Sequence, residues 1–492
     1  MQIANRTIFT RDNLEVMRGM DCESIDLIYL DPPFNSNTNY AAPIGSEAAG
    51  AAFKDTWTLS DLDEAWIGQI AEEYPAVHDM LNTTGIVAGR STKAYLTYMA
   101  IRLLEMRRIL KQDGSLYLHC DQTASHYLKM LLDAVLSPAR FQTEITWQRT
   151  SAHNDSHRFG NICDHLLFYG SRDINGDSIR VPLDAEHVQS SYRLEDGRGQ
   201  YSAGDFTGAG TRSGETGMPW RSFDPNRIGR HWSVPRTGSY ARWIDDNLIP
   251  GYTSVESVHA RLDALDAVGL IHYPVSGGMP QIKRYLAANP GRVPSNLWTD
   301  ISPIRPRARE RTGYPTQKPL RLLERIVGAS TNEGDVVFDP FCGCATACVA
   351  AEKLGRQWIG IDISEMAFRL VRDRLEREVH VGNGDRPSML ANVTHRTDVP
   401  VRTDSGEAVR SRDIKHVLYG RQEGICNGCQ TLFPFRNMTI DHIVPTARGG
   451  QNIDSNLQLL CQACNSVKGD RPQEYLVTQL RIRGVLPASG GR

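Results

Sequence analysis

Two pairs of cysteines near the end of the 492-residue chain carry the most specific chemical signal in the sequence. Two Cys-x-x-Cys knuckles bring four thiolates around one tetrahedral ion, which is the geometry of structural zinc. A short unit with few large apolar residues needs such a cross-link to fold. The spacing therefore predicts a bound Zn²⁺ with four ligands, which are Cys426, Cys429, Cys461 and Cys464.

A second set of polar residues lies between and just after these cysteines: Asp441, His442, Asn456 and Asn465. With them, residues 419–471 resemble the HNH (ββα-metal) nucleases. The resemblance implies that His442 is the general base that activates water and that Asn456 braces the loop that orients it. It also implies that Asp441 and Asn465 hold one divalent cation, Mg²⁺ or a similar ion, against the scissile phosphate. Asn465 stands where the name of the motif expects histidine, and the alternative is a zinc module that binds DNA without cutting it.

An acid and two prolines follow an apolar run near the start of the chain, where Asp31-Pro32-Pro33-Phe34 comes directly after Ile25–Leu30. In open α/β sheets, ligands bind at the carboxyl ends of strands. The exocyclic amine of a base is a poor nucleophile because its lone pair is delocalised, and two acceptors that hold its hydrogens can localise that pair. A carboxylate and a proline carbonyl would suffice, and Phe34 could stack on a base that has left the duplex. The alternative is a proline-rich turn capped by Asp31.

A glycine turn that opens a helix lies further along the chain, where Val336-Val337-Phe338 leads through Asp339 to Gly343. Residues 346–354 read as a helix, and residues 358–361 as a strand that ends at Asp362. A glycine turn lets a cofactor approach the backbone, and an acid about twenty residues on can accept from ribose hydroxyls. The turn has one glycine and matches the dinucleotide fingerprint poorly, so the alternative is an ordinary βαβ unit.

The two motifs resemble those of the DNA N6-adenine/N4-cytosine amino-methyltransferases of the β arrangement. They occur in the order of that family, and between them lies Thr312-Gly313-Tyr314-Pro315-Thr316-Gln317-Lys318-Pro319. The resemblance covers residues 25–375 and implies S-adenosyl-L-methionine as methyl donor and double-stranded DNA as partner. It implies that Asp31 and the Pro32 carbonyl hold the target amine, that Pro33 completes the turn, and that Phe34 stacks on the flipped base. It further implies a cofactor pocket with Asp362 on the ribose, formed by Phe341, Gly343, Asp362, Thr316 and Lys318.

The sequence also departs from this family pattern. The turn commonly reads Gly-Ser-Gly-Thr-Thr in the family, whereas here Ala345 replaces the second glycine, and its Cβ is expected to weaken cofactor affinity. No Pro-Cys dipeptide occurs, so cytosine C5 methylation, which needs a cysteine nucleophile, is not expected. The initial Asp31 resembles the adenine-specific members, while N4-cytosine transfer stays open. A third alternative is a binding protein that inherited the fold without activity.

Alternating apolar patterns place these motifs on a Rossmann-like α/β fold, a parallel-type sheet with helices on both faces. Residues 95–110 and 126–136 predict helices, and residues 115–119 predict a strand between them. Periodicity is weak over residues 171–299, where Arg and Trp are frequent, so we expect an inserted target-recognition region whose tryptophans mostly form a small core. The predicted domains are a methyltransferase at 1–380, a linker at 381–410 and the zinc-stapled HNH domain at 411–492.

The composition limits the binding surfaces and the cellular location that we expect for the protein. Lys and Arg number 55 against 57 Asp and Glu, so any DNA-binding surface must be local. One basic stretch, with Arg305, Arg307, Arg309 and Arg311 interrupted only by Glu310, is either such a surface or a solvated loop. No apolar run is long enough for a membrane span or a signal peptide, which predicts a cytoplasmic protein with reduced thiols and no membrane partner. The sequence leaves the oligomeric state open, a homodimer included.

Overall fold

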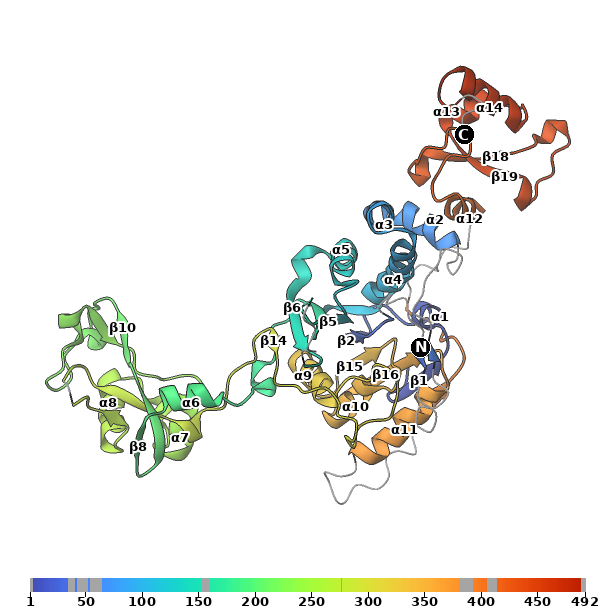
Figure 1. Cartoon of the computed structure of the whole chain (residues 1–492). Helices are drawn as coiled ribbons and strands as arrows, with labels where there is room; N and C mark the ends of the chain where they lie inside the picture. Colours follow the sequence, from blue (N-terminus) through green and yellow to red (C-terminus); the bar gives the residue numbers. More distant parts are fainter. Residues whose placement is uncertain are drawn as a thin grey trace. The chain divides into compact units, whose positions relative to one another are not determined.

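The chain divides into two compact units in the computed structural model, one formed by Met1–Asn175 with Ser295–Arg492 and one by Gly176–Pro294 (Figure 1). The structure describes residues 3–33, 40–41, 52–53, 64–151, 157, 159–275, 277–379, 393–404 and 414–487. Within these residues, no helix is long and apolar enough to cross a membrane.

A nine-stranded sheet forms the centre of the first unit. Every neighbouring pair is parallel except those that involve β7 (Cys163–Tyr169), which runs antiparallel to both β5 (Leu110–Cys120) and β6 (Phe141–Gln148). The sheet is therefore parallel-type as predicted, with one reversed strand, β7, which pairs antiparallel with the preceding strand β6. The order across the sheet is β14 (Leu297–Trp298), β6 (Phe141–Gln148), β7 (Cys163–Tyr169), β5 (Leu110–Cys120), β2 (Ile25–Leu30), β15 (Val336–Asp339), β16 (Gln357–Asp362), β1 (Thr7–Thr10) and β17 (Thr394–Arg396).

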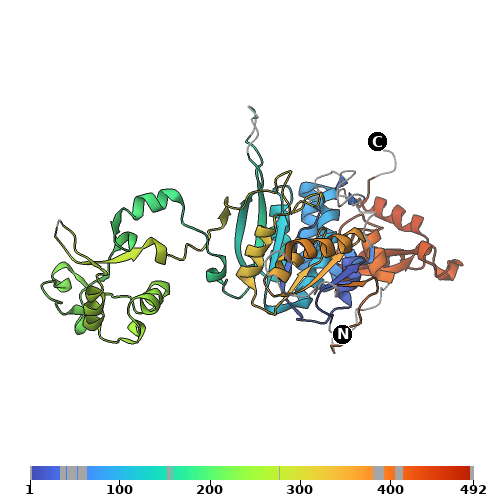
Figure 2. The same cartoon turned by 90° about the horizontal axis from the view of Figure 1, so that it is seen from below.

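Helices cover both faces of this sheet, and each face has its own apolar core (Figures 1 and 2). Side chains alternate along β2: Ile28 and Leu30 enter one core, while Leu27 and Tyr29 enter the other. The first core is covered by α1 (Asn13–Arg18), α2 (Glu64–Glu73), α3 (Pro75–Ala88), α4 (Arg90–Ile109) and α5 (Ser125–Leu136). The second is covered by α9 (Leu320–Ser330), α10 (Thr346–Lys353) and α11 (Met366–Val379). Elsewhere, β3 (Tyr40–Ala41) pairs antiparallel with β4 (Ala52–Phe53).

The predicted elements differ from the observed ones mainly at one junction. The helix predicted for residues 95–110 is α4, but the following strand begins at Leu110 and not at residue 115. Ile25 pairs with Leu110, and the register then shifts so that Leu27 pairs with Ser115. Asp113 and Gly114 therefore lie in an irregularity within β5.

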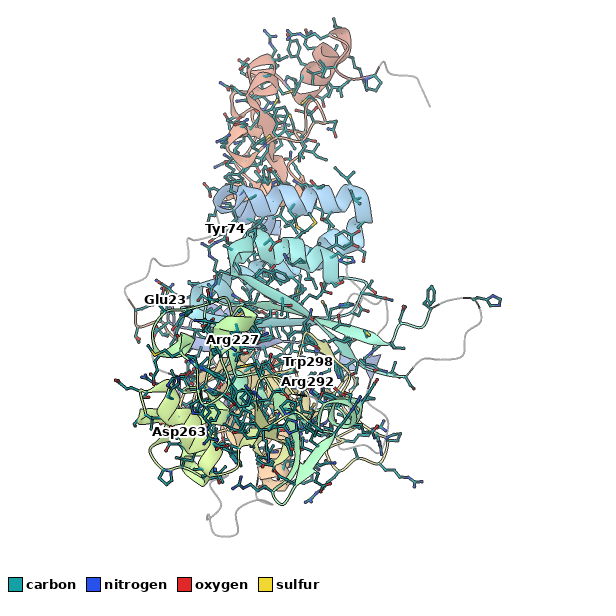
Figure 3. The ribbon with its side chains drawn as sticks, turned by 90° about the vertical axis from the view of Figure 1, so that its left-hand side faces the viewer. Glu23, Tyr74, Arg227, Asp263, Arg292 and Trp298 are labelled. Atoms are coloured by element: carbon teal, nitrogen blue, oxygen red, sulfur yellow. The ribbon has the colours of Figure 1, made fainter. Side chains whose placement is uncertain are left out.

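The second unit contains a small antiparallel sheet and three short helices. Trp220 and Trp232 are buried in its core, as expected for most tryptophans of this region, and the Trp220 Nε1 donates to Oδ1 of Asp263 at 2.9 Å. Asp263 is labelled in Figure 3. The strand order is β12 (Ile271–His272), β13 (Gln281–Tyr285), β9 (Gly199–Gly204) and β8 (Leu194–Asp196), and β10 (Thr207–Ala209) pairs with β11 (Arg230–Trp232). The helices are α6 (Ala185–Ser191), α7 (Ser239–Asn247) and α8 (Val258–Ala267).

The C-terminal module has a ββα core. Its antiparallel pair, β18 (Met438–His442) and β19 (Leu457–Cys461), is followed by α13 (Gln462–Lys468) and α14 (Gln473–Ile482), and α12 (Ile414–Arg421) precedes it. The stretch predicted as a linker contains β17, which pairs with β1 at the edge of the large sheet. Most of the other residues between 381 and 410 lie outside the described residues.

Candidate functional site

One cavity collects the residues that the two N-terminal motifs and the segment between them contribute. It measures about 340 Å³ and lies where β2, β15 and β16 end. Phe34 lies outside the described residues, and every other residue predicted for amine and cofactor binding lines the cavity: Asp31, Pro32, Pro33, Thr316, Lys318, Phe341, Gly343 and Asp362. Three parallel strands with adjacent carboxyl ends explain this convergence.

Asp31 has one occupied and one free carboxylate oxygen. Lys318 places its Nζ 2.6 Å from Oδ2, and both side chains are largely buried, at 7% exposed for Lys318 and 17% for Asp31. The other oxygen, Oδ1, is buried and has no hydrogen-bond partner among the described residues. Buried polar atoms are almost always partnered, so this oxygen is an acceptor suited to a ligand that enters the cavity.

The glycine turn is held in place by the acid at the end of the next strand. Oδ2 of Asp362 accepts from the Gly343 amide at 2.9 Å, and Oδ1 accepts from the Ser364 amide at 2.8 Å. Burial raises the pKa of Asp362 above its usual range. Gly343 has a φ of +50°, and a Cβ there would lie 2.9 Å from the ring of Tyr314. The turn therefore needs glycine at this position for both backbone and space.

Ala345, which replaces a family glycine, adopts the conformation that glycine would favour. Its φ is +55° and its side chain is fully buried. A left-handed non-glycine residue costs roughly 1–2 kcal/mol. Ala345 is not among the residues that line the cavity, so its methyl group lies behind the turn.

Asp339 is a cavity residue to which the sequence analysis gave no role. Its side chain is 3% exposed and accepts from the Phe341 amide at 3.2 Å. Burial raises the pKa of Asp339 well above its usual range, and the charges of Asp31 and Asp362 add to this. An Asp-Pro pair at the end of a buried strand, the same signal that Asp31 and Pro32 give, could have identified it.

A buried hydrogen-bonded chain lies beside the cavity and was also missed. The Tyr29 hydroxyl lies 3.1 Å from Nδ1 of His119, and Nε2 of His119 lies 3.1 Å from Oδ2 of Asp164. Burial lowers the pKa of His119, and the charge of Lys318 lowers it further. With a neutral ring, Nε2 donates to the carboxylate and Nδ1 accepts from the tyrosine, which lines the cavity.

The four cysteines of the C-terminal module form the cluster that the spacing predicted. One sulfur atom from each of Cys426, Cys429, Cys461 and Cys464 lies within 4.8 Å of all the others. The Gly428 and Cys461 amides approach the Cys426 sulfur at 3.4 and 3.2 Å, and the Cys464 amide approaches that of Cys461 at 3.5 Å. Amide donors stabilise negative charge on sulfur, so this donor set fits a tetrahedral zinc ion.

Asn456 fastens the loop that follows His442. Its side chain accepts from the Val444 amide at 2.9 Å and donates to the carbonyls of Val444 and Gln451 at 3.0 and 2.8 Å. His442 ends β18, and its Nε2 lies 3.2 Å from Oδ1 of Asn452. Asn456 and His442 therefore belong to the same fixed loop.

The predicted cation ligand Asp441 is already engaged by two side chains. Lys468, whose side chain is fully buried, lies 3.0 Å from Oδ2 of Asp441, and Gln458 donates to the same oxygen at 2.8 Å. Asn465 lies on α13, three residues before Lys468. One carboxylate and one amide oxygen fit a Mg²⁺ ion that keeps water and substrate phosphate as its other ligands. Such an ion would compete with Lys468 for Asp441.

The first helix of the C-terminal module packs on α2. A Cβ on Gly68 would lie 2.4 Å from the His416 carbonyl oxygen, so the two helix backbones touch. Nε2 of His416 lies 2.6 Å from Oε2 of Glu72. Glu423 pairs with Arg90 at 2.8 Å and with Lys93 at 3.3 Å. Polar pairs and close packing thus join this module to the helices over the large sheet.

Fold and cavity together define the class of protein: a Rossmann-like α/β core with a cavity at its strand ends and a ββα cysteine-cluster module. Family comparison gives the finer assignment. The N6/N4 family model described as DNA methylase matches residues 25–373, and the one described as HNH endonuclease matches residues 426–481. The chain therefore belongs to the N6/N4 DNA methylase family, is a DNA methyltransferase and carries a C-terminal HNH segment.

Individual relatives agree with this family. The type II methyltransferase M.EcaI of Enterobacter cloacae is 35% identical over 376 residues, which are 76% of this chain and 69% of that protein. The type III restriction-modification enzyme StyLTI Mod subunit of Salmonella typhimurium is 25% identical over 372 residues, 72% of this chain and 51% of that protein. Among solved structures, the M1.HpyAVI-SAM complex has 14% identity, covers 75% of this chain and 98% of its own, and gives a TM-score of 0.33.

Proposed function

We propose that this protein transfers a methyl group from S-adenosyl-L-methionine to the N6 amine of adenine in double-stranded DNA, and that its C-terminal module is an HNH endonuclease. The observation that carries the proposal is the buried Oδ1 of Asp31, which has no hydrogen-bond partner among the described residues and belongs to a side chain that lines the same cavity as the Gly343 turn. An acceptor and a cofactor turn in one cavity are what amine methylation requires.

At the reacting end of the cavity, Asp31 and the Pro32 carbonyl would accept the two hydrogens of the amine. This draws the lone pair out of conjugation, and Phe34 would stack on the flipped base. S-adenosyl-L-methionine supplies the electrophilic methyl group when bound. Asp31 would be the adjacent acceptor for the one proton that the amine nitrogen releases when it takes the methyl group. Lys318 fixes the rotamer of Asp31 through the 2.6 Å ion pair.

At the other end, Phe341 and Gly343 would contact the cofactor, Asp362 would bind its ribose, and Thr316 with Lys318 would complete the wall. These roles are supported by the shared cavity and by the positive φ of Gly343, which brings bare backbone to the cavity surface. The carboxylate of Asp362 already accepts two amides, and carboxylate oxygens have further lone pairs for ribose hydroxyls.

Adenine is proposed over cytosine because the motif begins with Asp31, which resembles the adenine-specific members of the family. The alternative is N4-cytosine transfer by an enzyme whose C-terminal module only binds DNA. The test incubates the purified protein with plasmid DNA and S-adenosyl-L-methionine and then analyses the nucleosides. We expect N6-methyladenine; N4-methylcytosine alone would support the alternative, and no methylated base would overturn both. Asp31→Ala should lose the product, whereas Asp79→Ala, on the exposed side of α3, should keep it.

In the C-terminal module, Zn²⁺ on the four cysteines would be structural. His442 would act as general base, with Asn456 bracing its loop, and Asp441 and Asn465 would hold Mg²⁺. The intact Asp441-His442 pair favours cleavage over mere binding. We expect the wild type to nick supercoiled plasmid in Mg²⁺ and His442→Ala to bind DNA without nicking it, while His126→Ala on α5 retains nicking. Equal nicking by His442→Ala would reject the assignment.

The proposed biological role is restriction-modification. It is supported by the names of the relatives, among them a type III restriction-modification Mod subunit, and by the presence of a nuclease-type module in the same chain. Methylation would mark the host's own sites, and the nuclease would cut DNA in the wrong methylation state.

A further inference from the structure

The loop between β14 and α9 presents a row of unpaired positive charge. Arg305, Arg307, Arg309 and Arg311 are all exposed, and within the described part of the chain none of them has a hydrogen bond or an ion pair through its side chain. Two successive turns order this backbone, since the Ala308 amide donates to Arg305 and the Arg311 amide donates to Ala308. Loops longer than about 12–15 residues without helix or strand, as here, are usually functional or disordered, and these turns argue against disorder.

The single acid of this stretch does not neutralise the arginines. Oε2 of Glu310 accepts from the amide of Leu320 at 2.8 Å, at the first residue of α9. The Glu310 carbonyl accepts from Nε2 of Gln317 at 2.6 Å. Because Glu310 is directed to the start of α9, the outward-facing side of the loop keeps four uncompensated charges.

The same loop is fastened to the wall of the cavity. Oε1 of Gln317 accepts from both the amide and the hydroxyl of Thr312 at 2.9 Å, and Thr312 is 1% exposed. Tyr314, Gln317 and Lys318 line the cavity, only a few residues after Arg311. The arginines are therefore carried on a rigid extension of the cavity wall.

From these observations, we infer that the Arg305–Arg311 row binds the phosphate backbone of the DNA duplex beside the base that enters the cavity. The inference rests on the proposed function, which brings a duplex to this cavity. Guanidinium groups form bidentate bonds with phosphate, and this anchored loop offers four of them within seven residues. The protein as a whole is not basic, at 55 Lys and Arg against 57 acids, so attraction to DNA has to come from such local rows.

The salt dependence of DNA binding measures this contact directly. Each neutralised phosphate contributes a slope of about −0.9 to log K against log[salt]. If each arginine neutralises one phosphate, the magnitude of the slope should fall by about 3–4 units in a variant that replaces all four by glutamine: Arg305→Gln, Arg307→Gln, Arg309→Gln and Arg311→Gln. Replacing the same four by lysine should keep most of the slope, because charge is retained.

The test uses the full-length protein and a fluorescent DNA duplex of mixed sequence, with anisotropy followed over roughly 50–200 mM NaCl. A matched pair of double variants sharpens it. Arg309→Gln with Arg311→Gln should lower the slope by about 2 units. Arg107→Gln with Arg369→Gln, two exposed arginines on α4 and α11, should leave it unchanged. Stabilisation by S-adenosyl-L-methionine in a thermal shift should be the same in every variant.

Unchanged slope and affinity in the four-site glutamine variant would overturn the inference and make the row a solvated loop. Absence of duplex binding by the wild type would overturn it too. A lowered slope in variants of a wild type that transfers no methyl group would instead support the inference and reject the proposed function. The two failures are thus distinguishable.

Discussion

The Nζ of Lys318 lies 2.6 Å from Oδ2 of Asp31, although 287 positions separate the two residues in the sequence. This ion pair joins the strand-end acid to the segment that begins α9, and it occupies one side of the carboxylate. The remaining oxygen, Oδ1, has no partner among the described residues and is left as an acceptor on a side chain that lines the cavity. The geometry explains how a single aspartate can be held by the protein and still meet a substrate.

Replacing Asp31 by Asn should abolish most methyl transfer without emptying the cofactor site. The amide keeps the size of the carboxylate but loses its charge and its capacity to accept a proton, so we expect the transfer rate to fall by about 10²–10⁴-fold. Single-turnover transfer of a labelled methyl group to DNA measures the rate. Asp79→Asn is the control, and a rate within a few-fold of wild type for Asp31→Asn would contradict the role of Asp31.

Substitutions at the two ends of the glycine turn should change different properties, cofactor affinity at Gly343 and stability at Ala345. Gly343→Ala places a Cβ 2.9 Å from the ring of Tyr314 at a φ of +50°, so the turn must shift and cofactor affinity should fall about tenfold or more. Ala345→Gly relieves a positive φ behind the turn but adds the entropy of glycine and removes a buried methyl group, so these terms should nearly cancel and the free energy of unfolding should change by less than about 1 kcal/mol.

Calorimetric titration with S-adenosyl-L-methionine and urea unfolding measure the two effects. Because Ala345 does not line the cavity, its replacement should leave cofactor affinity nearly unchanged. A large gain in affinity for Ala345→Gly would instead support the expectation from sequence that its Cβ obstructs the cofactor.

Because Asp339 is buried, we expect the free energy of unfolding to depend on pH in a defined direction. Burial raises its pKa in the folded state well above the unfolded value. Its stabilising contribution is therefore fully present below the unfolded pKa and is lost as pH rises through the folded pKa. The asparagine of the Asp339→Asn variant can still accept from the Phe341 amide but does not ionise. The variant should therefore not lose stability in this way as pH rises.

Urea unfolding from about pH 4 to about pH 8 tests this, because the unfolded carboxyl titrates near the lower end of the range. Wild-type stability should fall relative to Asp339→Asn as pH rises. A difference that stays constant with pH, or that changes in the opposite direction, would mean that Asp339 is ionised throughout. Asp113→Asn, at an exposed carboxyl paired with Arg172, controls for general charge effects.

Local patterns predicted the strands that carry the site, and the reason is physical. Residues 25–30 are apolar except for Asp26 because β2 is buried on both faces, and its end places Asp31 at the sheet edge. Gly343 and Asp362 could be found because their spacing along one βαβ unit is local. Both residues line the same cavity as Asp31 because β2, β15 and β16 are adjacent and parallel.

Contacts that depend on the order of strands distant in the sequence could not be predicted from local sequence patterns. The chain from Tyr29 through His119 to Asp164 exists because β7 runs antiparallel beside β5, and no local pattern specifies that neighbour. The strands of residues 176–294 are short, and their periodicity is too brief to detect. The pairing of Lys468 with Asp441 likewise crosses from helix to strand within the small module.

Removing one cysteine of the cluster should unfold the C-terminal module while the large sheet persists. Cys426 accepts from two amides through its sulfur, and its side chain lies in the apolar core of the module with Leu459 and Leu476. Zinc binding supplies much of the folding free energy of such small units, so Cys426→Ser should release the metal and expose the core.

We expect about one zinc ion per wild-type chain in elemental analysis and much less in the variant. Limited proteolysis should then cut the variant after residue 414 but leave the methyltransferase core intact. Cys120→Ser, at a buried cysteine of β5 outside the cluster, is the matched control and should keep its zinc. Equal zinc content in Cys426→Ser and the wild type would show that the four thiols do not bind the ion.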